Sequence, residues 1–342
     1  MDLVKQVKFG NTGIKISPII VGCMSYGTKE WSDWVIEDKE KVFEILKYCY
    51  DNGLRTFDTA DVYSNGVSER LIGEFLRKYK IRRETVVILT KIFAPIDETL
   101  TITLGNVFNL DPVAALDLSN QQGLSRKHII DGVAKSVERL GTYIDVLQIH
   151  RLDHDTPMEE IMRSLNDVVN SNQVRYIGAS SMLATEFVEL QFIAEKHGWH
   201  KFANWQTRYN LLYREDEREV IPFAKRHNIA LTPWSPNARG VLCRPWGQKT
   251  QRSNSDFYTD MLHHESDKAI VDRVEQLAKK KGVSMAMLSN AWVLHKGCYP
   301  IVGLSSVERA KEAIKSLEVK LSEDDISFLE EMYTPKPPST AD

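Results

Sequence analysis

Four polar residues follow three successive runs of β-branched and apolar residues. Asp58 and Tyr63 follow the first run, Lys91 ends the second, and His150 ends the third. A tyrosine phenol has a pKa near 10, and a neighbouring lysine ammonium would stabilise the phenolate and lower that value. An aspartate would hold the lysine in place, and a histidine could orient a carbonyl. Such a set suits proton exchange with a group that becomes an alkoxide, as a carbonyl does on accepting hydride.

Three of the four residues also have an ordinary interpretation. Tyr63 could be a loop tyrosine, Asp58 a turn former, and Lys91 a solvated surface charge. Their common position at strand ends favours a shared site instead, since the carboxyl ends of barrel strands carry the catalytic residues.

The elements that must position these residues alternate along the chain. Short apolar runs predict strands at Ile19–Gly22, Arg55–Asp58, Val86–Thr90, Ile144–His150, Arg175–Gly178, Phe202–Gln206, Ile229–Pro233 and Pro300–Gly303. Segments with helical periodicity predict helices at Asp38–Asp51, Ser68–Lys78, Arg126–Leu140, Pro157–Ser171, Thr185–His197, Arg214–His227, Lys268–Lys281 and Val307–Leu317.

Eight strand–helix units predict an α/β protein with a (β/α)8 TIM barrel over residues 1–342 as a single domain. An open doubly wound sheet is the alternative, but the G-x-G-x-x-G string typical of it is missing. A β-hairpin is expected at residues 5–17, and additional helices at Ser284–His295 and Glu323–Met332. The long loops 92–122 and 237–267 should emerge at the catalytic face.

Composition narrows the class of protein further. Lys plus Arg is 44 and Asp plus Glu is 47, a net charge of −3 that gives no general attraction to nucleic acid or membrane. The four cysteines are far apart in the sequence, and no apolar signal segment is evident, so a cytoplasmic location is expected. No metal site is expected, because the paired histidines lack further ligands at sensible positions.

Several strings together carry a family resemblance. GLRTFDTADVYSNGVSERLIGEFL at residues 53–76, TKI at 90–92, LQIHRLD at 147–153 and RYIGASS at 175–181 resemble the aldo-keto reductase superfamily, and its fungal aryl-alcohol dehydrogenase-like branch in particular. The resemblance implies a barrel and a catalytic tetrad of Asp58, Tyr63, Lys91 and His150. It also implies NADPH/NADP+ as cofactor and reversible reduction of aldehydes or ketones, aromatic or otherwise hydrophobic, with Tyr63 as general acid/base.

The same resemblance implies a cofactor site. Its residues are Ser180, Ser181, Gln206, Trp234, Ser235, Pro236, Asn237, Arg239, Gly240, Gly303, Ser305, Arg309 and Glu312. Trp234 would stack on the nicotinamide, and Arg309 would bind the 2′-phosphate, a task suited to a guanidinium. Three positions depart from the family pattern: Ser181 stands in place of an asparagine, Gly303 of a lysine, and Ala313 of an asparagine.

A substrate pocket is expected from Met24, Tyr26, Trp31, Phe93 and Arg151. The partner is then a small-molecule carbonyl or alcohol, and the sequence leaves the oligomeric state open. A second interpretation is a redox-sensing NADP(H)-binding subunit similar to potassium-channel β subunits, with little turnover. A metal-dependent barrel hydrolase would need His-x-His on an early strand, which the sequence lacks.

Overall fold

Eight parallel strands form a closed ring in the computed structural model, which describes residues 3–96, 98, 102–107, 109–248 and 264–338. They are β3 (Ile20–Gly22), β4 (Thr56–Asp58), β5 (Val87–Ile92), β6 (Ile144–Ile149), β7 (Val174–Ser180), β8 (Phe202–Gln206), β9 (Ala230–Leu231) and β10 (Ile301–Gly303). Strands β3 to β9 pair in chain order, and β10 pairs with β3. The ring closes between β9 and β10, where the N–H of Tyr299 donates to Leu231 (2.8 Å) and that of Ile301 to Pro233 (2.9 Å).

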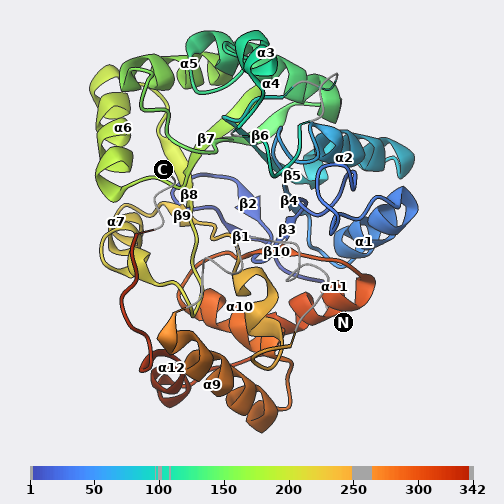
Figure 1. Ribbon diagram of the computed structural model, residues 1–342, viewed down its shortest axis with the longest axis vertical. Helices are drawn as coiled ribbons and strands as arrows, with labels where there is room; N and C mark the ends of the chain where they lie inside the picture. Colours follow the sequence, from blue (N-terminus) through green and yellow to red (C-terminus); the bar gives the residue numbers. More distant parts are fainter. Residues whose placement is uncertain (1–2, 97, 99–101, 108, 249–263, 339–342) are drawn as a thin grey trace.

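Helices surround this ring (Figure 1). They are α1 (Lys39–Asp51), α2 (Val67–Lys78), α3 (Pro112–Asp117), α4 (Arg126–Leu140), α5 (Met158–Asn170), α6 (Ala184–His197), α7 (Val220–Arg226), α9 (Glu265–Lys281), α10 (Met285–His295), α11 (Val307–Lys315) and α12 (Glu323–Glu330). In α4, for example, Ile129, Val133 and Leu140 form a buried apolar face toward the strands, whereas α12 packs on α9. The expected (β/α)8 barrel is confirmed, and the open sheet is wrong because the ring closes.

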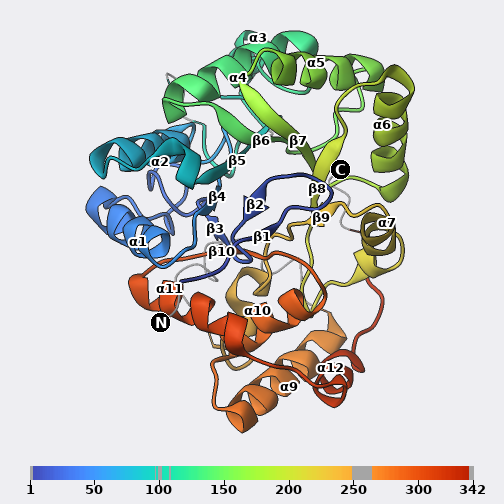
Figure 2. The same cartoon turned by 180° about the vertical axis from the view of Figure 1, so that it is seen from behind.

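The N-terminal hairpin also forms. Strands β1 (Val7–Lys8) and β2 (Lys15–Ile16) pair antiparallel and lie across the centre of the ring in both face-on views (Figure 2). Phe9 and Ile16 of this hairpin are fully buried and pack with Ile20, Leu89 and other strand residues. The hairpin therefore closes one end of the barrel, and the site must open at the other.

Two connections differ from the sequence prediction. The single helix expected over Arg214–His227 is instead a 3₁₀ turn at Glu215–Glu217 followed by α7. Pro222 explains the break, because proline has no N–H and is tolerated only in the first turn of a helix. The long segment after β5 contains the short helix α3, which Asp111 caps by accepting from the N–H groups of Val113 and Ala114.

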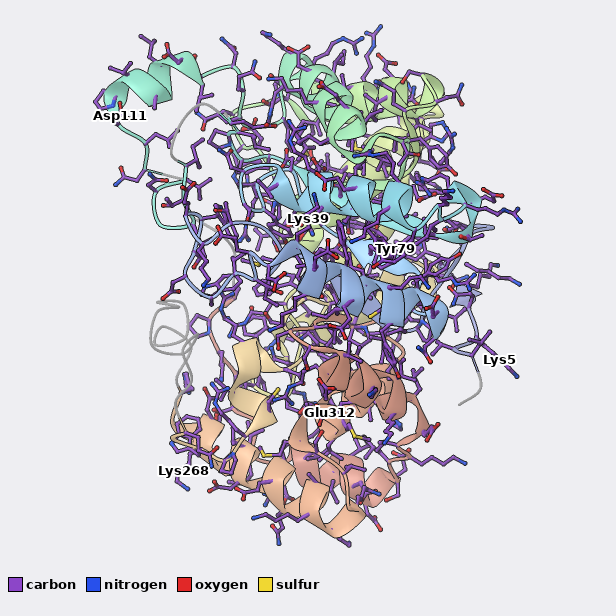
Figure 3. All side chains as sticks on the ribbon, turned by 90° about the vertical axis from the view of Figure 1, so that its right-hand side faces the viewer. Lys5, Lys39, Tyr79, Asp111, Lys268 and Glu312 are labelled. Carbon is purple, nitrogen blue, oxygen red and sulfur yellow. The ribbon has the colours of Figure 1, made fainter. Side chains whose placement is uncertain are left out.

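A side view shows that helix α3 and the N-terminal hairpin lie at opposite ends of the molecule. Figure 3 shows α3, which begins beside the labelled Asp111, projecting at the end opposite Lys5 of the hairpin. The expected loop 237–267 falls partly outside the described residues. Its first part is a 3₁₀ segment at Ala238–Cys243, and α9 begins at Glu265, three residues before the predicted start. No described helix has the length and apolar character that crossing a membrane requires.

Candidate active site

Asp58, Lys91 and Tyr63 form a connected group at the carboxyl end of β4 and β5. The Lys91 Nζ donates to the Asp58 Oδ1 (2.5 Å), the Thr59 carbonyl (2.8 Å) and the Tyr63 hydroxyl (3.3 Å). Lys91 and Asp58 are both almost completely buried. The ring of His150, which follows β6, meets that of Tyr63 edge-on at 5.8 Å between centroids. The structure thus brings together all four residues of the expected tetrad.

A tight turn after β4 sets the position of Tyr63. The N–H of Thr59 donates to Leu89 (2.8 Å), and that of Asp61 to Lys91 (3.2 Å), so the turn continues the pairing of β4 with β5. Directly after Tyr63, the residues Ser64, Asn65 and Gly66 all have positive φ angles, and the chain then enters α2. This left-handed stretch reverses the chain and leaves the Tyr63 ring above the barrel.

Burial and neighbouring charges shift the pKa values of Tyr63, Lys91 and His150. Burial raises the pKa of the Tyr63 phenol, and the Lys91 ammonium opposes the rise without cancelling it. Lys91 thus lowers the pKa of Tyr63 as expected, but removal from water outweighs this effect, so the pKa remains above its ordinary value. Burial would lower the pKa of Lys91, but Asp58 and Tyr63 outweigh it and raise that pKa. Burial, assisted by Lys91 and Arg151, holds the pKa of His150 well below its usual value, so its imidazole is neutral.

A cavity of about 430 Å³ opens above the tetrad and continues toward α11. Asp58, Tyr63 and His150 line it, while Lys91 lies directly beneath. All thirteen residues expected at the cofactor site line the same cavity: Ser180, Ser181, Gln206, Trp234, Ser235, Pro236, Asn237, Arg239, Gly240, Gly303, Ser305, Arg309 and Glu312.

Near the tetrad, the cavity wall is built of hydrogen-bonding groups and one indole. The Trp234 Nε1 donates to the Ser181 hydroxyl (3.3 Å), which also lies 3.1 Å from the hydroxyl of Ser180. Ser181 has a φ of +49° and donates its N–H to the Gln206 carbonyl (3.1 Å). The serine that replaces the family's asparagine is therefore fixed between two strands and orients the indole.

At its far end, the cavity is lined by cations. The Arg309 Nη1 lies 2.8 Å from the Glu312 Oε2, one turn further along α11. Arg239 and Gly240, with φ angles of +54° and +96°, form a kink in the segment after β9. Arg244 and Asn290 also line this end, and sequence reasoning missed both. Arg244 lies four residues after Gly240, which was expected at the cofactor site, and this closeness is the one signal that could have drawn attention to it.

The remaining wall, beside Tyr63 and His150, is mainly apolar. Met24, Trp31, Phe93 and Arg151 line it as expected. Tyr26 does not: it is buried in the core, where its hydroxyl donates to the Leu304 carbonyl (2.7 Å). Its place on this wall is a correction to the sequence analysis, because a buried phenol needs a partner and finds it between β10 and α11.

Leu104 and Val107 complete this wall, and both belong to the long segment after β5. The N–H of Leu104 donates to the Trp31 carbonyl (3.0 Å), which ties the segment to the pocket. The sequence marked the segment as long but gave no indication which of its residues would reach the site. Among the residues that the structure describes, no group of three or more His, Cys, Asp or Glu could hold a metal ion.

Comparisons with known proteins agree with this geometry. The sequence model of the Aldo/keto reductase family matches residues 18–334. A Saccharomyces cerevisiae protein named "Putative aryl-alcohol dehydrogenase AAD16" is 66% identical over 98% of this chain and 99% of its own length. The versiconal hemiacetal acetate reductase of Aspergillus parasiticus is 50% identical over 97% and 98%, respectively. The chain therefore belongs to the aldo/keto reductase family, oxidoreductases that reduce carbonyl groups with a nicotinamide cofactor.

Proposed function

We propose that this protein is an NADPH-dependent reductase of aldehydes and ketones, reversible toward alcohol oxidation, with Tyr63 as the general acid/base. One observation carries the proposal: the Tyr63 hydroxyl lies in the wall of the cavity and 3.3 Å from a buried ammonium, that of Lys91. A phenol placed in this way can give a proton to a carbonyl oxygen, and the cation stabilises the phenolate that remains.

Each tetrad residue has a separate part in this proposal. The raised pKa keeps the Tyr63 phenol protonated at neutral pH, the form that reduction requires. Lys91 stabilises the phenolate, and Asp58 holds Lys91 in place. The neutral imidazole of His150 can donate an N–H to the carbonyl oxygen and so orient the substrate. A nicotinamide cofactor, when bound, supplies the hydride.

The groups along the cavity fit a phosphorylated dinucleotide. The indole of Trp234 and the polar groups of Ser180 and Gln206 suit a nicotinamide carboxamide beside the tetrad. The guanidinium groups at the other end suit phosphates, and Arg309 stands at the start of α11, where helix N–H groups also favour an anion. These features support NADPH even though Gly303 offers no cation.

The apolar wall supports an aromatic or otherwise hydrophobic carbonyl substrate. Trp31 and Phe93 face the cavity together with Leu104 and Val107. The rings of Trp31 and Tyr63 lie 6.1 Å apart between centroids, so an aromatic substrate would meet an aromatic wall next to the proton donor. One relative is named for an aryl alcohol and the other for a hemiacetal acetate, and both names support the same class of substrate. The four cysteines are all free, which supports a cytoplasmic location.

The test is NADPH oxidation, followed by absorbance, with aromatic aldehydes against aliphatic aldehydes of similar size and with NADH in parallel. We expect turnover with NADPH and higher kcat/KM for the aromatic series. Tight NADPH binding with hardly any turnover across the panel would favour the redox-sensing interpretation instead.

Tyr63→Phe tests the assignment of the proton donor. The substitution removes the hydroxyl and keeps the ring, so turnover should fall by about 10²-fold or more. NADPH affinity, measured by quenching of tryptophan fluorescence, should stay nearly unchanged. Wild-type turnover in this variant would show that another group donates the proton.

A further inference from the structure

A buried network of side-chain amides lies beneath the tetrad. The Asp58 Oδ2, the oxygen that does not meet Lys91, accepts from the Nε2 of Gln148 (3.1 Å) and the Nε2 of Gln206 (2.8 Å). Gln148 is fully buried on β6, two residues before His150. Both oxygens of the Asp58 carboxylate thus accept hydrogen bonds from buried side chains.

Gln148 is the junction of this network. Its Oε1 accepts from the Nε2 of Gln206 and from the Nδ2 of Asn204, each at 2.8 Å. The Asn204 Nδ2 also donates to the Thr232 hydroxyl (2.9 Å) on the far side of the network from Asp58. Gln148 therefore contacts the carboxylate on β4 and both amides on β8, strands that alternate around the barrel (Figure 1).

The direction of these bonds follows from the charge of Asp58. An ionised carboxylate only accepts hydrogen bonds, so both glutamines must turn their NH₂ groups toward it. The oxygen of Gln148 then faces β8 and accepts the second N–H of Gln206. With its NH₂ group engaged by Asp58 and Gln148, Gln206 has only its Oε1 to offer the cavity that it lines.

The neighbouring strand leaves room for the network. Gly178 on β7 pairs in register with Gln148, and a Cβ at Gly178 would lie only 1.9 Å from the Asn204 Oδ1 and 3.1 Å from the Gln148 Cγ. A side chain at this position would displace the amides. The backbone of β7 is thus shaped around the contact between Gln148 and Asn204.

We propose that Gln148 is a positioning residue that fixes both the carboxylate of Asp58 and the amide orientation of Gln206. It couples the group that holds Lys91 to the Gln206 amide oxygen, which would accept from the carboxamide NH₂ of a bound nicotinamide. Without Gln148, the NH₂ group of Gln206 keeps only its hydrogen bond to Asp58, so the orientation of its amide is held by one contact instead of two. The proposal rests on the proposed function for the catalytic role of Asp58.

Gln148→Met tests the proposal with nearly constant volume. We expect kcat for carbonyl reduction to fall by about 10-fold or more and the Kd for NADPH to rise about 3- to 10-fold, with little change in KM for the carbonyl. The matched control is Thr232→Val, which removes a buried hydrogen bond of the same network at the end away from Asp58. It should lower the melting temperature while leaving kcat and the Kd for NADPH close to wild type.

Gln148→Glu gives a second readout, the pH profile. The charged groups facing position 148 are Asp58 on β4 and Lys91 on β5, while β7 and β8 present Gly178, Asn204 and Gln206. A protonated Glu at this position can donate to Asp58 and accept from β8, as Gln148 does. An ionised Glu at this position would place its carboxylate beside that of Asp58, and two neighbouring negative charges are unfavourable. We expect kcat of this variant to fall with rising pH over a range where the wild-type profile is flat.

The outcomes separate the proposal from its premise. If Gln148→Met loses stability but keeps wild-type kcat and NADPH affinity, or if Gln148→Glu has the wild-type pH profile, Gln148 is structural only and the proposal is overturned. If Gln148→Met does not fold, the pH profile of Gln148→Glu still decides. If the wild-type protein itself shows no carbonyl reduction, the proposed function fails, while the NADPH titrations still test the orientation of Gln206.

Discussion

Lys91 is a buried cation whose three N–H donors each have an acceptor. Asp58 and Tyr63 supply two of these from their side chains, and the Thr59 carbonyl supplies the third. Removing an ammonium from water is costly, and charge-assisted bonds of this kind offset the cost. Lys91 is therefore held in a single position, and the Tyr63 hydroxyl always has a cation beside it.

Lys91→Met should shift the pH dependence of alcohol oxidation upward. In the proposed mechanism, oxidation requires the phenolate of Tyr63, and the Lys91 ammonium lowers the pKa of that phenol against the effect of burial. Removing it raises the pKa further, so the rising limb of kcat/KM for oxidation should move to higher pH, and neutral-pH turnover should fall by about 10-fold or more. An unchanged limb in pH-resolved kinetics would contradict this role.

The variant also leaves the charge of Asp58 without its cation, which can cost about 3–5 kcal/mol of stability. The double variant Asp58→Asn, Lys91→Met removes both charges and serves as the control. It should regain stability, measured by urea unfolding, without regaining the wild-type pH profile.

Among the secondary-structure elements, helix α11 supplies Arg309 and Glu312 to the end of the cavity where we propose that the 2′-phosphate binds. Ser306 caps the helix by accepting from the N–H of Arg309 (3.3 Å), which places the arginine in the first turn. Its guanidinium is half exposed and paired with Glu312. A phosphate that binds Arg309 must therefore share the guanidinium with the Glu312 carboxylate or displace that carboxylate.

Arg309→Ala should separate the two nicotinamide cofactors. Losing a charge-assisted pair with the 2′-phosphate should cost about 1.5–3 kcal/mol, or roughly 10- to 150-fold in NADPH affinity. NADH has no such phosphate, so its affinity should hardly change. Glu312→Gln is a companion variant: it frees the Arg309 guanidinium from its ion pair, so any effect on NADPH affinity through Arg309 should be an increase. Fluorescence titration with both cofactors checks this, and a parallel loss for NADH and NADPH would contradict it.

The sequence predicted the strand ends well, because parallel strands in a barrel direct all their carboxyl ends to one face. The sequence placed Asp58, Lys91 and His150 at the carboxyl ends of strands, where the structure has them. It could not predict which polar residues inside strands form a network, so Gln148 and Asn204 went unremarked. Nor could it separate Tyr26 from the pocket residues around it, since that depends on where the phenol finds an acceptor.

The C-terminal segment joins elements that lie far apart in the sequence. Tyr333 donates its hydroxyl to Glu215 (2.6 Å), and the N–H of Lys336 donates to the same carboxylate (2.8 Å). The Lys336 ammonium forms a buried ion pair with Asp267 at the start of α9. The segment after α12 thus joins α9 to the 3₁₀ turn that precedes α7.

Lys336→Met should be strongly destabilising. It leaves the buried carboxylate of Asp267 without its cation, and such a loss costs about 3–5 kcal/mol in the free energy of unfolding. Lys47→Met is the control, because Lys47 pairs with Asp51 on an exposed helix face, where a pair contributes about 0.5 kcal/mol or less. Urea unfolding of both variants tests the difference, and equal small losses would contradict the importance of the tail.

The closure between β9 and β10 has a consequence for local opening. The strands that meet there are short, and the segments that follow them, from Trp234 and from Gly303, both line the cavity. A ligand filling that cavity would bridge the two sides and hold the barrel shut. The amide hydrogens of Tyr299 and Ile301 should therefore exchange with solvent deuterium faster than those of β6, and NADPH should slow them. If NADPH does not change the exchange rates of these two amides, the contact between β9 and β10 is stable without the cofactor.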